Sequence, residues 1–202
     1  MLNRKALSFA LAALAIPATS FAAFALEGNQ LQVFAGDSPR MVTRIGYWDQ
    51  ATQSLPGQFS ITYGSPAWKA EYDGMLDQLK GKRVRLGDNN WPTLETNLPL
   101  TIGNQNVAPG IYYIALECSA EGNFQLVLLD PKEIIAKKMD AFQAGQTKGG
   151  ILVPLTYAKS DTAAEKLTIS LKRGEVDVKK AKLEIAWGNH KATAPIAVTF
   201  QS

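Results

Sequence analysis

Short stretches in which apolar and polar side chains alternate recur along most of the chain. They comprise residues 59–63, 98–102, 111–117, 124–129, 151–157, 166–172, 181–187 and 193–200. Alternation with a period of two places the apolar side chains on one face of an extended strand. Such segments, separated by turn residues such as Gly110 and Gly174, predict an all-β fold. We expect an antiparallel β-sandwich of jelly-roll or immunoglobulin-like size, with one or two short packed helices.

Two further segments have helical spacing. In one, Asp130 suits an N-cap, and Pro131 and Glu133 suit the first turn. In the other, an apolar stripe begins at Trp68 and ends before Gly81. We expect both stripes to pack on the sandwich, because amphipathic helices bury their apolar face. The stripes comprise Ile135, Met139 and Phe142 in the first segment, and Trp68, Tyr72, Leu76 and Leu79 in the second.

The first 25 residues have the pattern of a secretory signal peptide. Arg4 and Lys5 precede an apolar stretch over residues 6–16, and small residues follow up to Ala25. We expect cleavage after Ala25, with a cut after Ala22 as the nearest competitor. The sequence therefore predicts a periplasmic or secreted protein.

The remaining residues, 26–202, have the length of one domain. Within it, residues 26–57 precede the clearest alternation, and an added strand, a clasp over the sandwich and a loose arm all fit them. No later apolar run is long enough for a transmembrane anchor, and no cysteine follows the cleavage site to carry a lipid.

Charge argues against a nucleic-acid partner. The formal net charge of +3 includes Arg4 and Lys5, so the rest of the chain is close to neutral. A nucleic-acid binder normally carries a basic patch that releases several phosphate counterions. The local basic cluster, which we interpret as a solvated edge, comprises Lys80, Lys82, Arg83 and Arg85.

One cysteine and one histidine limit the chemistry further. Cys118 is in phase with a strand, which favours a buried, inert thiol over a nucleophile, and a lone cysteine excludes an intramolecular disulfide. His190 follows Gly188 and Asn189, which predict a hairpin turn, so we interpret it as a surface histidine without a role. No nucleophile elbow, closed zinc site, dinucleotide motif or P-loop occurs, and we expect no cofactor.

Several ordered motifs together resemble one protein family. They are YGSPAWK at 63–69, KRVRLGDNNW at 82–91, VAPGIYY at 107–113 and LEIAWG at 183–188. This set resembles the bacterial domain-of-unknown-function family 2911 (DUF2911) over roughly residues 58–200. The resemblance implies an exported bacterial β-sandwich with no established activity.

Aromatic, cationic and amide side chains form the most distinctive candidate site. Such a mixture suits a ligand with an apolar face and a polar rim, for example a carbohydrate. In the alternative interpretation Trp68 belongs to the helical stripe and Trp91 closes one end of the sandwich. The candidate ligand-binding residues are Tyr63, Trp68, Lys69, Arg85, Asn90 and Trp91.

The sequence therefore favours a non-catalytic protein that binds a ligand, such as a carbohydrate, or a cell-envelope protein. One alternative is a hydrolase of envelope polymers that uses carboxylates such as Asp88 or Glu95, since glycosidases need a pair of them. Another is a structural or assembly protein of the envelope. Asp88, Asn90 and Glu95 also offer oxygen ligands for calcium, but their spacing is not that of a calcium-binding loop, and we predict no metal site.

Overall fold

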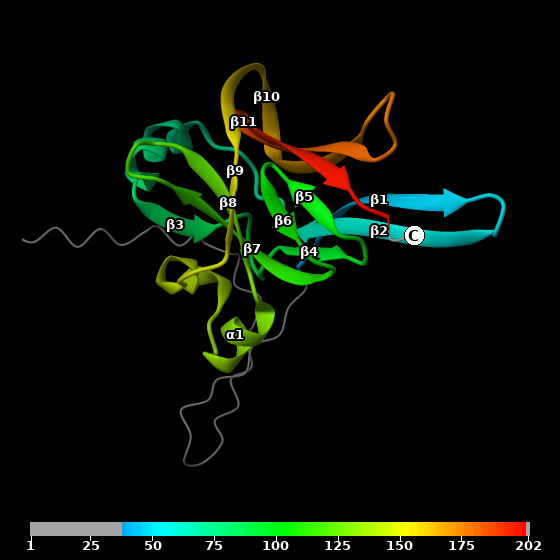
Figure 1. The fold of residues 1–202 in the computed structure, drawn as a ribbon. Helices are drawn as coiled ribbons and strands as arrows, with labels where there is room; N and C mark the ends of the chain where they lie inside the picture. Colours follow the sequence, from blue (N-terminus) through cyan, green and yellow to red (C-terminus); the bar gives the residue numbers. More distant parts are fainter. Residues whose placement is uncertain (1–37, 201–202) are drawn as a thin grey trace, which may run out of the picture. The chain divides into compact units, whose positions relative to one another are not determined.

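A computed structural model describes residues 38–200 of the chain. Within them the backbone forms a seven-stranded and a four-stranded sheet (Figure 1), and all pairings between strands are antiparallel. The larger sheet has the order β1-β2-β4-β7-β8-β9, with β3 beside β7, and the smaller has the order β10-β11-β5-β6. The strands of the larger sheet are β1 (Met41–Asp49), β2 (Ser54–Tyr63), β3 (Lys82–Arg85), β4 (Thr93–Thr96), β7 (Gly110–Cys118), β8 (Phe124–Leu129) and β9 (Ile151–Pro154). Those of the smaller are β5 (Leu100–Ile102), β6 (Gln105–Val107), β10 (Thr156–Arg173) and β11 (Lys180–Val198).

The predicted antiparallel sandwich is confirmed, and its core lies between the two sheets. Phe59 and Ile61 of β2 are buried in the same cluster as Leu183 and Ile185 of β11. The alternation that predicted the strands therefore also identifies the side chains that join the sheets. The predicted signal peptide, residues 1–25, lies outside the described residues.

Strand β11 confirms the predicted hairpin at Gly188. Although β11 is continuous over Lys180–Val198, its two halves run in opposite directions, since the Val198 N–H donates to the carbonyl of Lys179 (2.8 Å) and Lys191 lies 2.9 Å from Glu184. The register with β10 shifts on either side of the Ala164–Gly188 pair, which marks a bulge. Gly188 has a φ of +56°, and a Cβ there would lie 2.3 Å from the Trp68 ring. Glycine is thus favoured here by the positive φ at the chain reversal and by the close approach of the Trp68 ring.

The sequence pattern did not predict β3, β4 or β6, which are three or four residues long, and it left β1 open as the added strand considered for residues 26–57. In β3 the outward side chains are charged, and Arg83 pairs with Glu117 of β7 at 2.8 Å with a side chain that is 10% exposed. β1 lies within the segment 26–57 and pairs with β2 from Met41 onward.

The helical segments are shorter than predicted. They are the 3-10 helices η1 (Ala70–Leu79) and η2 (Ala141–Gln146) and the α-helix α1 (Pro131–Ala136). Asp130 caps α1 as expected, since its side chain accepts a hydrogen bond from the backbone N–H of Lys132 (2.8 Å).

The predicted apolar stripe after Asp130 is wrong. Ile135 and Phe142 are 64% and 76% exposed, while Ile134 is buried. Helix α1 ends near Lys138, which has a φ of +53°, and a new capping box at Asp140 starts η2. Because the helical phase is broken between them, spacing across residues 135–142 does not define one face.

Helix α1 and η2 cover part of the outer face of the larger sheet, where they form a second, smaller core. Ile134 of α1 and Ala141 and Ala144 of η2 pack there against Val127 and Leu129 of β8. This cover accounts for a continuous apolar run in β8, whose residues from 126 to 129 are all buried.

Candidate functional site

Tyr63 lies in the core, between the sheets. It is 3% exposed, and its hydroxyl donates to the carbonyl of Ile169 (3.2 Å) and accepts from the N–H of the same residue (3.0 Å). Both hydrogen bonds join β2 to β10. Tyr63 therefore has a structural role, because its hydroxyl both donates and accepts a hydrogen bond within the protein.

Trp91 belongs to a cluster that is covered by the helical segments. Its side chain packs with Tyr113 and Met139 in the second core, and we call these three residues the Trp91 cluster. The Trp91 ring is 8% exposed and stacks on Tyr113 with centroids 5.5 Å apart. Its Nε1 donates to the carbonyl of Met139, at 3.4 Å. No large part of the ring is left to meet a ligand.

Arg85 lies over the exposed ring of Phe142, with the guanidinium carbon 4.1 Å from the ring centroid. Its Nη1 donates to the carbonyl of Asn89 (2.9 Å). Burial lowers the pKa of Arg85, while the charges of Asp88 and Asp140 act in the opposite direction. Arg85 thus has protein partners for its charge and its planar face.

Lys69 and Asn90 are exposed. Lys69 lies 3.8 Å from a carboxylate oxygen of Glu71, and the carbonyl of Asn90 accepts from Arg40 at 3.5 Å. The six candidate residues thus occupy separate environments: core, helix-covered face, exposed surface and, for Trp68, an aromatic cluster.

Trp68 lies at the centre of that cluster. Its ring is half-buried and meets three other rings edge-on or tilted, with centroid distances of 5.7 Å to Tyr72, 5.1 Å to Trp187 and 5.4 Å to His190. We call these four residues the Trp68 cluster. The bulge at Gly188 admits the Trp68 ring, so the backbone conformation of β11 shapes this part of the molecule.

His190 is the residue that the sequence interpretation misjudged. It lies in β11 directly after the chain reversal at Gly188, but its side chain is only 11% exposed. Its Nε2 is 2.6 Å from Asp73 Oδ1, and its Nδ1 is 2.8 Å from the hydroxyl of Tyr157. Because an ionised carboxylate only accepts, Nε2 carries the proton and, on a neutral ring, Nδ1 accepts from Tyr157. Both ring nitrogens are therefore engaged.

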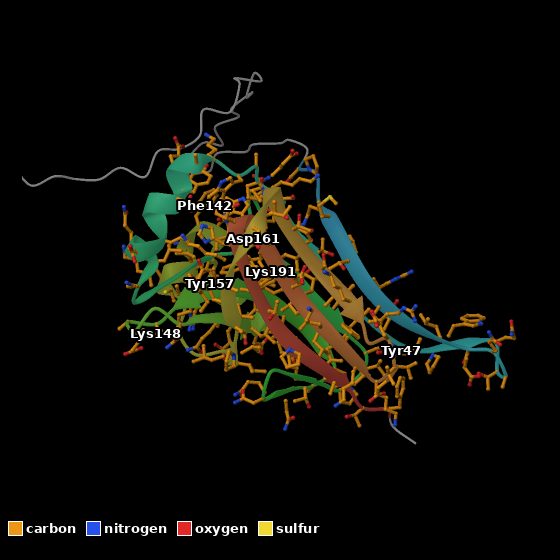
Figure 2. The ribbon with its side chains drawn as sticks, turned by 90° about the horizontal axis from the view of Figure 1, so that it is seen from above. Tyr47, Phe142, Lys148, Tyr157, Asp161 and Lys191 are labelled. Atoms are coloured by element: carbon orange, nitrogen blue, oxygen red, sulfur yellow. The ribbon has the colours of Figure 1, made fainter. Side chains whose placement is uncertain are left out.

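A cleft of about 450 Å³ opens beside His190. It lies where η1, the turn between β7 and β8, the start of β10 and the second half of β11 come together. Phe124 and Tyr157, the latter labelled in Figure 2, contribute aromatic rings with centroids 5.3 Å apart. The lining residues are Asp73, Leu76, Asp77, Lys80, Cys118, Gly122, Phe124, Tyr157, Lys159 and His190.

Two groups that line the cleft, Cys118 and Tyr157, have raised pKa values. Burial raises the pKa of Cys118, with Lys80 opposing it, and the thiol is 3% exposed. The predicted burial of this cysteine is confirmed. Burial, and then the charge of Asp73, raise the pKa of Tyr157, so its hydroxyl stays protonated and remains a hydrogen-bond donor. The cleft thus offers fixed donors and acceptors rather than an activated nucleophile.

The oxygen-bearing residues considered for calcium are separate from this cleft. Glu95 lies in β4 and is exposed, and Asp88 packs against the backbone of Gly64. Among residues 38–200 no group of three or more His, Cys, Asp or Glu side chains is placed to hold a metal ion.

The sequence signal for this cleft was weak. Trp68 and Trp187 were visible as part of apolar patterns, but Asp73 and Tyr157 had no feature that distinguished them. Their contacts with His190 join residues 117 and 33 positions apart in sequence. A strand glycine next to a tryptophan, as at Trp187 and Gly188, is the local sign that a ring approaches the backbone closely.

Comparison with known proteins identifies a family and nothing more specific. The family model described as "Protein of unknown function (DUF2911)" matches residues 49–196, which confirms the resemblance seen in the sequence. No curated protein and no solved structure matches the chain significantly. In the described part of the chain, no helix has the length and apolar character needed to cross a membrane.

Proposed function

The chain belongs to the DUF2911 family, whose function is unknown, and from that premise we propose that it is an exported, non-catalytic binding protein of the cell envelope. Its leader is removed after Ala25. Its ligand site is the cleft beside His190, and its ligand is a carbohydrate of the envelope.

The observation that carries the proposal is the union of aromatic faces and fixed polar groups in one cleft. Phe124 and Tyr157 offer ring surface, and Asp73 and Lys159 offer charged groups, with Asp73 held in place by His190. Sugars have apolar faces bordered by hydroxyl groups, so they fit such a combination. Of the six residues expected at a ligand site, Trp68 keeps a part in it, because its ring supports His190.

Binding fits the cleft better than hydrolysis. The hydroxyl within hydrogen-bond distance of His190 is that of Tyr157, and burial raises the pKa of this phenol, which disfavours a nucleophilic role for it. Tyr157 and Cys118 both have raised pKa values and stay protonated near neutral pH. The carboxylates proposed for a hydrolase, Asp88 and Glu95, do not line the cleft.

Export is tested by the N-terminus of the protein recovered from a bacterial host. We expect mass spectrometry of the purified protein to find Leu26 as the first residue, and fractionation to find it outside the cytoplasm. An intact Met1, with the protein retained in the cytoplasm, would overturn this half of the proposal.

Ligand binding is tested on an array of bacterial envelope glycans. We expect capture of at least one glycan, and Tyr157→Ala should weaken it by about tenfold or more, because the variant loses a ring and a hydrogen bond. Phe142→Ala, which removes an exposed ring elsewhere, is the matched control and should bind like the wild type. Equal binding by Tyr157→Ala, or release of cleaved product from a captured glycan, contradicts the proposal.

A further inference from the structure

We propose that the end of the molecule formed by two hairpin turns docks onto the surface of an anionic lipid bilayer. One turn joins β1 to β2 and the other joins β10 to β11. This surface is separate from the cleft, and the inference does not depend on the proposed function. We call the end formed by these two turns the hairpin end.

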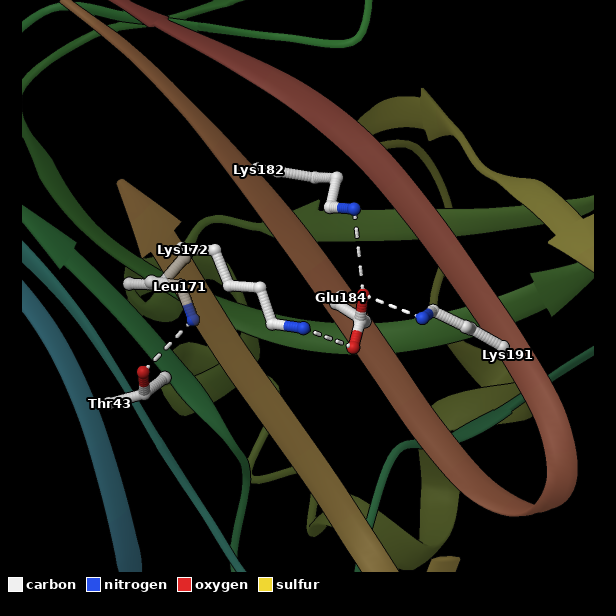
Figure 3. A network of polar contacts seen from close by, with 6 residues as sticks. All are labelled: Thr43, Leu171, Lys172, Lys182, Glu184 and Lys191. Atoms are coloured by element: carbon white, nitrogen blue, oxygen red, sulfur yellow. Dashed lines mark hydrogen bonds and ion pairs between the residues drawn. The ribbon is translucent and has the colours of Figure 1, made fainter. Parts of the chain in front are cut away.

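The two turns lie at the same end of residues 38–200 (Figure 1). Contacts between the elements hold them there. The Tyr47 ring packs edge-on against Phe200 with centroids 4.9 Å apart, and Figure 2 shows Tyr47 beside the ends of β10 and β11. The Leu171 N–H donates to Thr43 Oγ1 at 3.0 Å, which ties β10 to β1 (Figure 3). These contacts hold the strands of the two hairpins side by side.

Each turn of the hairpin end carries exposed apolar side chains. Trp48 and Leu55 are 58% and 46% exposed on the first turn, and Val176 and Val178 are 100% and 67% exposed on the second. Large apolar side chains gathered on projecting turns are typical of an interaction surface. Tryptophan in particular favours the boundary between the lipid headgroups and the hydrocarbon.

Cations flank the apolar tip of the second turn. They outnumber the acids of the same turn, Glu175 and Asp177. The basic residues are Lys172, Arg173, Lys179, Lys180 and Lys182. A basic segment close to an anionic bilayer is attracted to it, and the attraction falls off within a Debye length.

Glu184 organises part of this charge on the outer face of the smaller sheet (Figure 3). Its carboxylate oxygens lie 2.7 Å from Lys172, 3.6 Å from Lys182 and 2.9 Å from Lys191, and the Glu184 side chain is 12% exposed. Lys172 and Lys182 are also directly opposite in register, an arrangement of like charges that costs stability. One carboxylate facing three ammonium groups leaves a net positive patch at the edge of the hairpin end.

The combination of apolar tips and flanking cations indicates which kind of partner binds the hairpin end. A soluble polyanion would use the lysines without the valines. A second copy of the chain would bring the same positive charge against itself. An anionic bilayer meets both features, because it accepts apolar side chains below a layer of negative headgroups.

Vesicle co-sedimentation of the purified full chain tests the inference, with the same N-terminus verified for every variant by mass spectrometry. We expect binding to phosphatidylcholine vesicles that contain phosphatidylglycerol and little binding to phosphatidylcholine alone, with loss of binding at high salt. The double change Val176→Ser and Val178→Ser should lower the partition coefficient by about tenfold or more. Lys179→Glu with Lys180→Glu should lower it similarly.

The matched control is Ile111→Ser with Ile135→Ser, which removes two exposed apolar side chains outside the hairpin end and should leave binding unchanged. The inference is overturned if the valine variant binds vesicles like the wild type, or if both vesicle types bind equally. Capture by soluble polyglutamate at the same strength, or a dimer on a sizing column that the valine changes abolish, would likewise contradict it.

Discussion

Trp68 and Trp91 entered the candidate site on the same grounds, yet the fold gives them opposite surroundings. Trp91 stacks on Tyr113 and is covered by the helical segments. Trp68 remains half-buried next to His190, at the side of an open cleft. A tryptophan among polar residues is thus no evidence of a binding site until its neighbours are known.

The difference arises from what packs against each ring. Around Trp91 the neighbours include small or apolar residues such as Ala141 and Ala144, and the ring is almost fully covered. Around Trp68 the bulge at Gly188 brings the ring against β11, where His190 binds Asp73 and Tyr157. The Trp68 cluster combines packing with the hydrogen bonds of His190, whereas the Trp91 cluster combines packing with one hydrogen bond, from Trp91 Nε1 to the carbonyl of Met139.

The largest effect is expected for Trp91→Ala. Removing a buried ring from the Trp91 cluster should lower the free energy of unfolding by about 3–5 kcal/mol. Trp48→Ala, a change of an exposed tryptophan, should stay within about 0.5 kcal/mol of the wild type. Urea denaturation measures both. Similar stability of the two variants would show that Trp91 is not the packing residue described here.

Gly188→Ala probes the Trp68 cluster at its tightest contact. A Cβ would lie 2.3 Å from the Trp68 ring and would occupy a backbone with a φ of +56°. We expect a loss of about 2–3 kcal/mol by urea denaturation, together with a change in tryptophan fluorescence. Gly74→Ala is the control, because a Cβ there has no atom within 4 Å. A tolerated alanine at 188 would contradict the packing of Trp68 on β11.

An acid titration probes Glu184 on the charged outer face of the smaller sheet, rather than the Trp68 cluster or the Trp91 cluster. Burial raises the pKa of Glu184, but hydrogen bonds and charges from Lys172 and Lys191 outweigh it and bring the pKa to about 2. Because the folded-state pKa lies below the ordinary value of 4.5 for a glutamate, the ionised form stabilises the fold above pH 4.5. The stabilisation is lost as the pH falls towards 2.

Between these pH values the wild type should lose about 1–2 kcal/mol more than Glu184→Gln, since the partly exposed lysines are screened by solvent. Urea denaturation across the pH range gives the slope of the unfolding free energy against pH, for the wild type and for Glu184→Gln. Parallel slopes for the wild type and the variant would show that the network does not hold Glu184 in its charged form.

The smallest effect on stability is expected for Asp73→Ala. The carboxylate holds η1 to His190 at an exposed position, so its loss should cost about 0.5–1.5 kcal/mol. Because η1 lines the cleft above the buried Cys118, alkylation of that thiol by iodoacetamide should become several-fold faster. Asp161→Ala, at an exposed position of β10, is the control. Unchanged alkylation would mean that Asp73 does not hold η1 in place.

The sequence predicted what depends on local periodicity. Leu183 and Ile185 fall on the inner face because side chains alternate across a strand. In a strand as long as β11 this alternation spans enough residues to be recognised in the sequence. The stripe from Ile135 to Phe142 failed because one left-handed residue, Lys138, resets the helical phase. The polar contacts of the cleft were beyond sequence reasoning, since Asp73 meets His190 across 117 positions.

The most direct test uses 5-fluorotryptophan, because the chain has four tryptophans and single substitutions assign their ¹⁹F resonances. Envelope glycans from the array are titrated into the labelled protein. We predict that the resonances of Trp68 and Trp187 shift with the ligand, while those of Trp91 and Trp48 stay in place. A shift of Trp91 with Trp68 and Trp187 unchanged would contradict the assignment of the ligand site to the cleft beside His190.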